Sequence, residues 1–129
     1  MWILWSALLT GVVIYGVIAT ILPATTPVPE LQTLMLAITV IGLVVTGVVL
    51  LGARMIARGT KQYFIFSILR WALSESVAIG GLILHFIGAS ANVTYAFVGW
   101  SIVLFLVLAP RDSDRARFES HLSDRGPGR

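Results

Sequence analysis

Two charged residues lie within a long apolar stretch of this chain and are its first candidates for chemistry. Arg70 and Glu75 are the only Asp, Glu, Lys or Arg residues between positions 63 and 88. Charged side chains inside a membrane span are costly, and they usually pair, face water or serve a function. Glu75 lies almost at the midpoint of the stretch and is too short to reach the lipid headgroups, so we expect it to be neutral, paired or next to water.

A helical wheel predicts where these side chains point. Five residues of an α-helix turn through about 140°, so Arg70 and Glu75 leave different faces of one helix. We expect Arg70 and His85 to face into a bundle. We expect Glu75 to face another helix or a second copy of the chain, where an Arg70–Glu75 pair between subunits fits the geometry. The inward stripe of small and polar residues, a composition that suits close helix packing in lipid, consists of Ser67, Arg70, Ser74, Ala78, Gly81, His85 and Gly88.

Polar residues at a similar depth on the other apolar stretches are candidate hydrogen-bond partners for the embedded charges. They are Thr10 and Tyr15 on the first stretch, Thr46 on the second, Ser74 on the third and Ser101 on the fourth. In the alternative interpretation the serine and threonine hydroxyls bond to the backbone of their own helices, which is common in membrane spans.

The embedded titratable residues have more than one interpretation. Glu75 either binds and releases a proton or a monovalent cation, or forms with Arg70 a buried polar clamp that fixes helix packing. His85 is interpreted as a packed or interfacial histidine, and a role in proton chemistry is its alternative. Which interpretation of Glu75 and of His85 holds depends on the helices that position these residues.

Four apolar stretches are near the length that a membrane span needs, which is about 20 residues. These stretches are residues 2–22, 31–53, 63–88 and 93–109. Only 12% of the 129 residues are charged, against about 25% in a soluble domain, and the mean hydropathy is +0.93. The sequence therefore predicts an all-α fold, with a four-span transmembrane helical bundle over residues 1–110 and a polar tail over residues 111–129.

Basic residues outside the four stretches predict the orientation of the chain. They cluster in the connector after the second stretch and in the tail, and the other two connectors have no Lys or Arg. Because cytoplasmic segments carry an excess of Lys and Arg, both termini are expected in the cytoplasm. The two basic clusters are Arg54, Arg58 and Lys61, and Arg111, Arg115, Arg117, Arg125 and Arg129.

The composition also argues against several classes of function. The chain has no cysteine, which excludes disulfides, thiol nucleophiles and thiolate metal sites. Its two histidines, His85 and His121, are too far apart to predict a metal site. The spans hold no Ser/His/Asp set, so neither an enzyme nor a cofactor is expected. The net charge of +3 is accounted for by the basic residues that set the orientation of the chain, and it gives no support to nucleic-acid binding.

The segment from Arg70 to Leu84, Arg-Trp-Ala-Leu-Ser-Glu-Ser-Val-Ala-Ile-Gly-Gly-Leu-Ile-Leu, resembles the second helix of the proteolipid (c) subunit of rotary ATP synthases. That helix typically reads Ala-Leu, one residue, Glu, a small residue and an apolar run through Gly-Leu. The resemblance implies that Glu75 takes the position of the ion-carrying carboxylate. The whole chain resembles small four-helix bacterial membrane proteins with a proteolipid-like third span, which implies the bacterial inner membrane.

Two functions are therefore expected as alternatives. In the first, Glu75 handles a proton or monovalent cation for transport or energy coupling, within a homo-oligomer formed through the third span. In the second, the chain is a non-transporting membrane scaffold or accessory subunit, whose embedded charges stabilise packing or assembly. A small multidrug exporter is disfavoured, because exporters of that type carry a glutamate in the first span and residues 2–22 have none. The lipid bilayer is the expected environment in every case.

Overall fold

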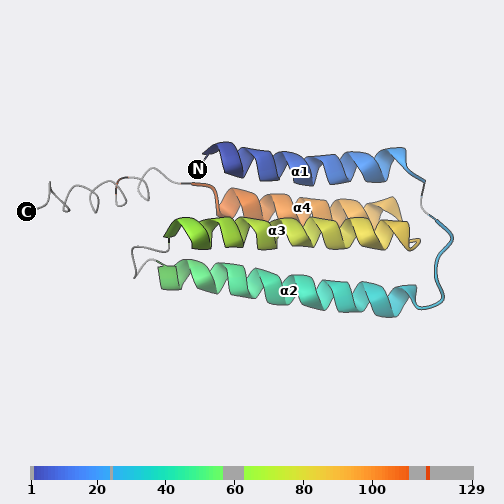
Figure 1. Ribbon diagram of the computed structural model, residues 1–129. Helices are drawn as coiled ribbons and strands as arrows, with labels where there is room; N and C mark the ends of the chain where they lie inside the picture. Colours follow the sequence, from blue (N-terminus) through green and yellow to red (C-terminus); the bar gives the residue numbers. More distant parts are fainter. Residues whose placement is uncertain (1, 24, 57–62, 111–115, 117–129) are drawn as a thin grey trace, which may run out of the picture.

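Four α-helices, joined by short connectors, make up the part of the chain that the structure describes. The structure is a computed structural model that describes residues 2–23, 25–56, 63–110 and 116, with side chains omitted for 53–56, 63 and 64. The helices are α1 (Trp2–Ile21), α2 (Leu31–Ile56), α3 (Tyr63–Phe86) and α4 (Ala91–Val107). Successive helices run in opposite directions, and no strand occurs among the described residues (Figure 1). The all-α prediction is confirmed.

Three of the helices are long and apolar enough to cross a membrane. They are α1, α2 and α3, whereas α4 is apolar but has only 17 residues. The outer surfaces are also apolar: Val12 and Ala19 are the buried residues of α1, and Ile41 and Leu51 of α2 are each 61% exposed. Apolar side chains on an outer face are stable in lipid and unfavourable in water. These features indicate a membrane protein.

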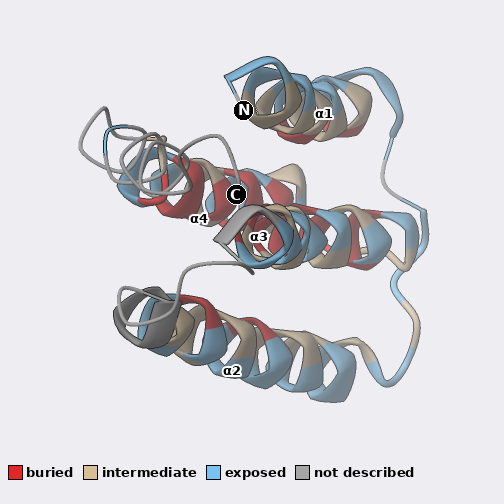
Figure 2. Cartoon of the chain, turned by 60° about the vertical axis from the view of Figure 1, so that its left-hand side comes forward, coloured by how far each residue is buried: buried red, intermediate tan, exposed pale blue. Residues whose placement is uncertain are grey.

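The third helix lies at the centre of the bundle. It packs against each of the other three helices, while α1 also packs against α4. Buried residues gather on the faces that α3 and α4 turn toward their neighbours (Figure 2). The inward stripe expected on α3 is buried at Ser67, Ser74, Ala78, Gly81 and His85.

The helix ends differ from the expected spans by a few residues. The second helix continues to Ile56 instead of ending at residue 53, so Arg54 is helical. The third ends at Phe86, two residues early, and the fourth begins at Ala91, two residues before the expected start. Of the other basic residues that predict orientation, Arg58, Lys61 and those of the tail lie outside the described residues, as does the tail apart from Ala116.

Gly88 allows the connector after α1 to pack against the turn between α3 and α4. Its φ is +103°, and a Cβ on it would lie 2.4 Å from Cα of Pro27. Alanine at position 88 would have to adopt a left-handed backbone conformation, and its Cβ would collide with the connector. We therefore expect Gly88→Ala to destabilise the protein by at least about 1–2 kcal/mol. The midpoint of thermal unfolding in mild detergent measures this loss. Gly99→Ala, in open space on α4, is the control and should leave the midpoint unchanged or higher.

Candidate functional site

Glu75 forms a hydrogen bond with Tyr15 across the interface between α1 and α3. The phenolic hydroxyl of Tyr15 donates to Oε1 of Glu75 at 2.8 Å, and both side chains are half-buried. Glu75 thus faces another helix of its own chain. Of the polar residues considered as partners, Tyr15 is the one that the described structure brings to the carboxyl group.

Gly11 leaves the space that the carboxyl group occupies beside α1. It lies four residues before Tyr15, so the two share one face of the helix. A Cβ on Gly11 would lie 3.0 Å from Oε1 of Glu75, a tight contact. Sequence reasoning did not identify this glycine, although its four-residue spacing from Tyr15 is a signal that suggests it.

The inner side of the site is an apolar core. Val12 follows Gly11 on α1, and Trp71 and Ala78 of α3 lie one turn to either side of Glu75; all three side chains are at most 2% exposed. The indole Nε1 of Trp71 donates to the carbonyl of Leu108 at 3.1 Å, so this ring is held in place. An ionised carboxylate is strongly disfavoured in such surroundings unless it is paired. The site therefore places a carboxyl group between an apolar core and the outer face of the bundle.

Two further hydroxyl groups, on residues that neighbour Gly11 and Glu75 in the sequence, bond to their own helices. Thr10 donates to the carbonyl of Ser6 at 2.7 Å, and Ser76 donates to that of Leu73 at 2.6 Å. These contacts follow the back-bonding that is usual for serine and threonine in apolar helices.

The predicted partners Ser74, Ser101 and Thr46 also bond to backbone carbonyls. Ser101 is fully buried on α4 and donates to the carbonyl of Ser74 at 2.6 Å, which ties α4 to α3. Ser74 donates to the carbonyl of Arg70 at 2.9 Å, and Thr46 donates to that of Gly42 at 2.8 Å. Only the bond of Ser101 joins two helices, since those of Ser74 and Thr46 stay within their own. Arg70 itself is half-buried on α3. A pair between Arg70 and Glu75 of two subunits stays a prediction.

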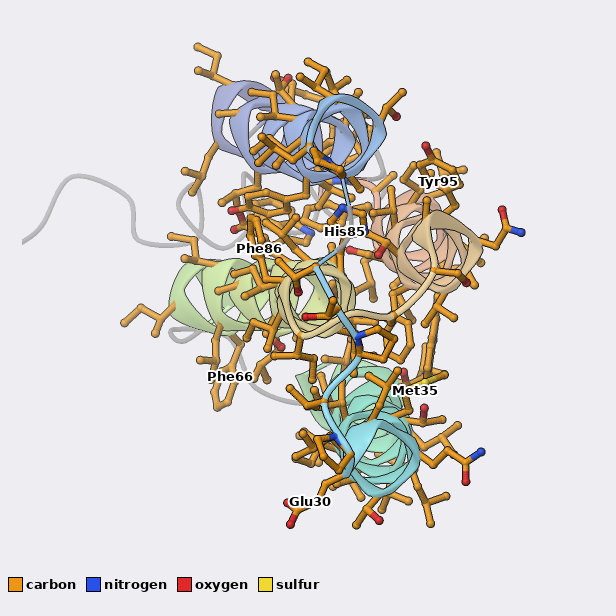
Figure 3. All side chains as sticks on the ribbon, turned by 90° about the vertical axis from the view of Figure 1, so that its right-hand side faces the viewer. Glu30, Met35, Phe66, His85, Phe86 and Tyr95 are labelled. Atoms are coloured by element: carbon orange, nitrogen blue, oxygen red, sulfur yellow. The ribbon has the colours of Figure 1, made fainter. Side chains whose placement is uncertain are left out.

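His85 lies where α1, α3 and α4 meet, at the end of the bundle opposite the N-terminus (Figure 3). Its side chain is 1% exposed, and its Nε2 lies 2.8 Å from the carbonyl of Leu22. Because a carbonyl oxygen only accepts, Nε2 carries the hydrogen and donates it. Leu22 directly follows α1, whose last carbonyls lack helical partners, so His85 caps this helix end. Its Nδ1 is buried and has no hydrogen-bond partner among the described residues.

Removing the His85 cap should lower stability. We expect His85→Ala to cost about 1–3 kcal/mol, because a carbonyl loses its donor and the buried ring leaves a void. The apparent melting temperature in detergent reports the loss. His85→Gln supplies an amide donor of similar reach and should recover part of it. An unchanged melting temperature in His85→Ala would show that the contact does not hold the end of α1.

Among the described residues, four side-chain hydrogen bonds attach α1 and Leu22, which directly follows it, to the rest of the bundle. Besides those of Tyr15 and His85, Trp5 donates through Nε1 to the carbonyl of Phe105 at 3.1 Å, and the hydroxyls of Thr20 and Tyr95 lie 2.8 Å apart. These bonds are distributed along the whole helix. The Glu75 contact is thus one member of a series that orients α1.

Comparisons with known protein families, with curated proteins and with solved structures find no match to this chain. The proteolipid resemblance of the segment around Glu75 therefore stays a prediction from the sequence. Within the described ranges, no group of three or more His, Asp or Glu side chains is placed to hold a metal ion. The site is defined by its own geometry, which centres on Glu75, Tyr15 and Gly11.

Proposed function

We propose that this chain is a four-span inner-membrane protein in which Glu75 binds and releases a proton or monovalent cation, for transport or energy coupling. The observation that supports it best is the hydrogen bond from Tyr15 of α1 to Glu75 at the middle of the apolar helix α3. Twelve residues of α3 precede Glu75 and eleven follow it, counted over Tyr63–Phe86. The carboxyl group therefore lies near the centre of a span.

The energetics of a mid-membrane carboxyl group favour an ion-handling role. The Tyr15 hydroxyl supplies one neutral donor to Glu75, which satisfies part of the carboxylate but does not cancel its charge. An uptake of one cation or proton neutralises the group, and its release recreates the charge. A site that alternates between these two states is what ion coupling requires.

The proposal includes an orientation with both termini in the cytoplasm, which requires that α4 also spans the membrane. Seventeen helical residues extend about 25 Å, a few ångströms less than the hydrocarbon core, a mismatch that bilayers accommodate at modest cost. The helix packs against α3, and the ends of α2 and α4 lie at the same end of the bundle as the start of α1 (Figure 1). The basic connector and tail begin at this end, which we assign to the cytoplasm.

A scaffold is the second candidate, and the four bonds that attach α1 favour it. In this function Glu75 accepts the Tyr15 hydrogen bond only to orient the helix. No protonation change is then needed, and partners bind elsewhere on the bundle.

Ion flux in reconstituted vesicles tests the proposal. The purified protein and its Glu75→Gln variant are inserted into lipid vesicles, and the decay of an imposed pH or cation gradient is followed. Ion handling predicts faster decay with the native protein than with the variant. Equal decay rates would contradict it and favour the scaffold.

A further inference from the structure

We infer that the ion bound at Glu75 is a proton and that the site excludes Na⁺ and other metal cations. This inference rests on the proposed function and identifies its ligand. Three features of the site support it: the supply of oxygen atoms, the continuity of the two helices and the space beside the carboxyl group.

Few oxygen atoms of the described residues are available to a metal ion at this site. A cation leaves water for a protein site only when several protein oxygens replace its hydration shell. Beside the carboxyl group, the described partner is the hydroxyl of Tyr15, whose hydrogen points at Oε1 of Glu75. The hydroxyls of Thr10 and Ser76 are bonded to carbonyls of their own helices. The number of ligands suits a proton, which needs one oxygen.

The backbone around the site offers no substitute ligands. Cation sites in membrane transporters commonly use carbonyls that are freed where a helix is broken. Both α1 and α3 are continuous helices. Among the described residues, a positive φ occurs only at Gly88 and no peptide bond is cis. The carbonyls near Glu75 therefore take part in helical hydrogen bonds.

The space on the α1 side of the carboxyl group is also small. Oxygen–cation distances in protein sites are about 2.0–2.6 Å for the common divalent ions, so a bound metal ion requires room of its own. A single Cβ on Gly11 would already lie 3.0 Å from Oε1 of Glu75. A metal ion between the carboxyl group and α1 would have to push them apart, whereas a proton adds almost no volume.

Two ion gradients in the same vesicles test this inference. With the native protein, we expect an imposed pH gradient to decay as fast in choline buffer as in sodium buffer. We expect uptake of radioactive sodium to equal that of Glu75→Gln vesicles. Sodium uptake that depends on Glu75, or proton flux that sodium inhibits or requires, would overturn the inference while leaving ion handling intact. If neither ion moved in a Glu75-dependent way, the proposed function itself would fail, and the inference with it.

Discussion

Glu75→Gln is expected to reduce ion flux to the level of empty vesicles while leaving the fold and the thermal stability almost unchanged. The amide oxygen of glutamine still accepts the hydrogen bond from Tyr15, so the contact between α1 and α3 is preserved. We expect the free energy of unfolding to change by no more than about 0.5–1 kcal/mol. An amide cannot take up and release a proton at physiological pH, so the exchange step is lost. Vesicle flux and melting temperature, measured on the same preparation, report the two effects separately.

Glu75→Leu is the matched control because it removes both the titrating group and the hydrogen-bond acceptor. Its melting temperature should fall, since the Tyr15 hydroxyl loses its partner, at a cost of about 1 kcal/mol. If Glu75 only accepts the hydrogen bond from Tyr15, leucine alone is harmful and the glutamine variant behaves like the native protein in every measurement. Native flux with glutamine at position 75 would therefore refute ion handling at this residue.

Gly11→Ala is expected to impair ion flux severely without loss of stability. The new methyl group would lie 3.0 Å from Oε1 of Glu75. Because Oε1 is the end of a flexible side chain, the carboxyl group can swing away. The cost of weakening its bond to Tyr15 is offset because alanine is favoured over glycine in a helix by about 1 kcal/mol. The bond from Tyr15 to Glu75 is then stretched or broken. A displacement of about 1 Å at a reacting group can cost roughly a hundredfold in rate.

Gly16→Ala provides the matched control on the same helix. A Cβ at Gly16 would lie 3.5 Å from Val98, an ordinary van der Waals contact, with no atom of Glu75 within 4 Å. We expect native flux and equal or higher stability in this variant. If the two alanine variants lose flux to the same degree, the effect arises from α1 in general and the proposed role of Gly11 is wrong.

The sequence predicts most of the fold because the apolar stretches are long and well separated by breaks. The connector between α1 and α2 contains Pro23, Pro27 and Pro29, which explains why both helix ends nearby were predicted to within one residue. The other ends do not follow this rule: the third helix begins at the predicted residue 63, whereas the fourth ends at Val107, two residues before its predicted end beside Pro110. The second helix runs past the predicted end at residue 53 because Arg54, although charged, is a good helix former.

The candidate site was only partly predictable, and the reason lies in α1. Glu75 stood out because a carboxyl group in the middle of an apolar stretch is rare. The choice of Tyr15 over Thr10 as its partner depends on how α1 is rotated, but α1 is apolar around its whole circumference, so its sequence does not mark an inner face. Gly11 was missed for the same reason. By contrast, α3 carries a small and polar stripe, and its buried face was predicted from Ser74 and His85.

Infrared spectroscopy of the protein in lipid tests most directly whether Glu75 takes up and releases a proton. A protonated carboxyl group has a C=O stretching band apart from the amide and carboxylate bands. Because the other Asp and Glu residues of the chain give the same band at low pH, the native spectrum is compared with that of Glu75→Gln; we predict such a band in the difference between the two spectra, and its loss as the pH is raised. A band that persists unchanged across the accessible pH range, or a native spectrum identical to that of the glutamine variant, would contradict proton binding and release at Glu75.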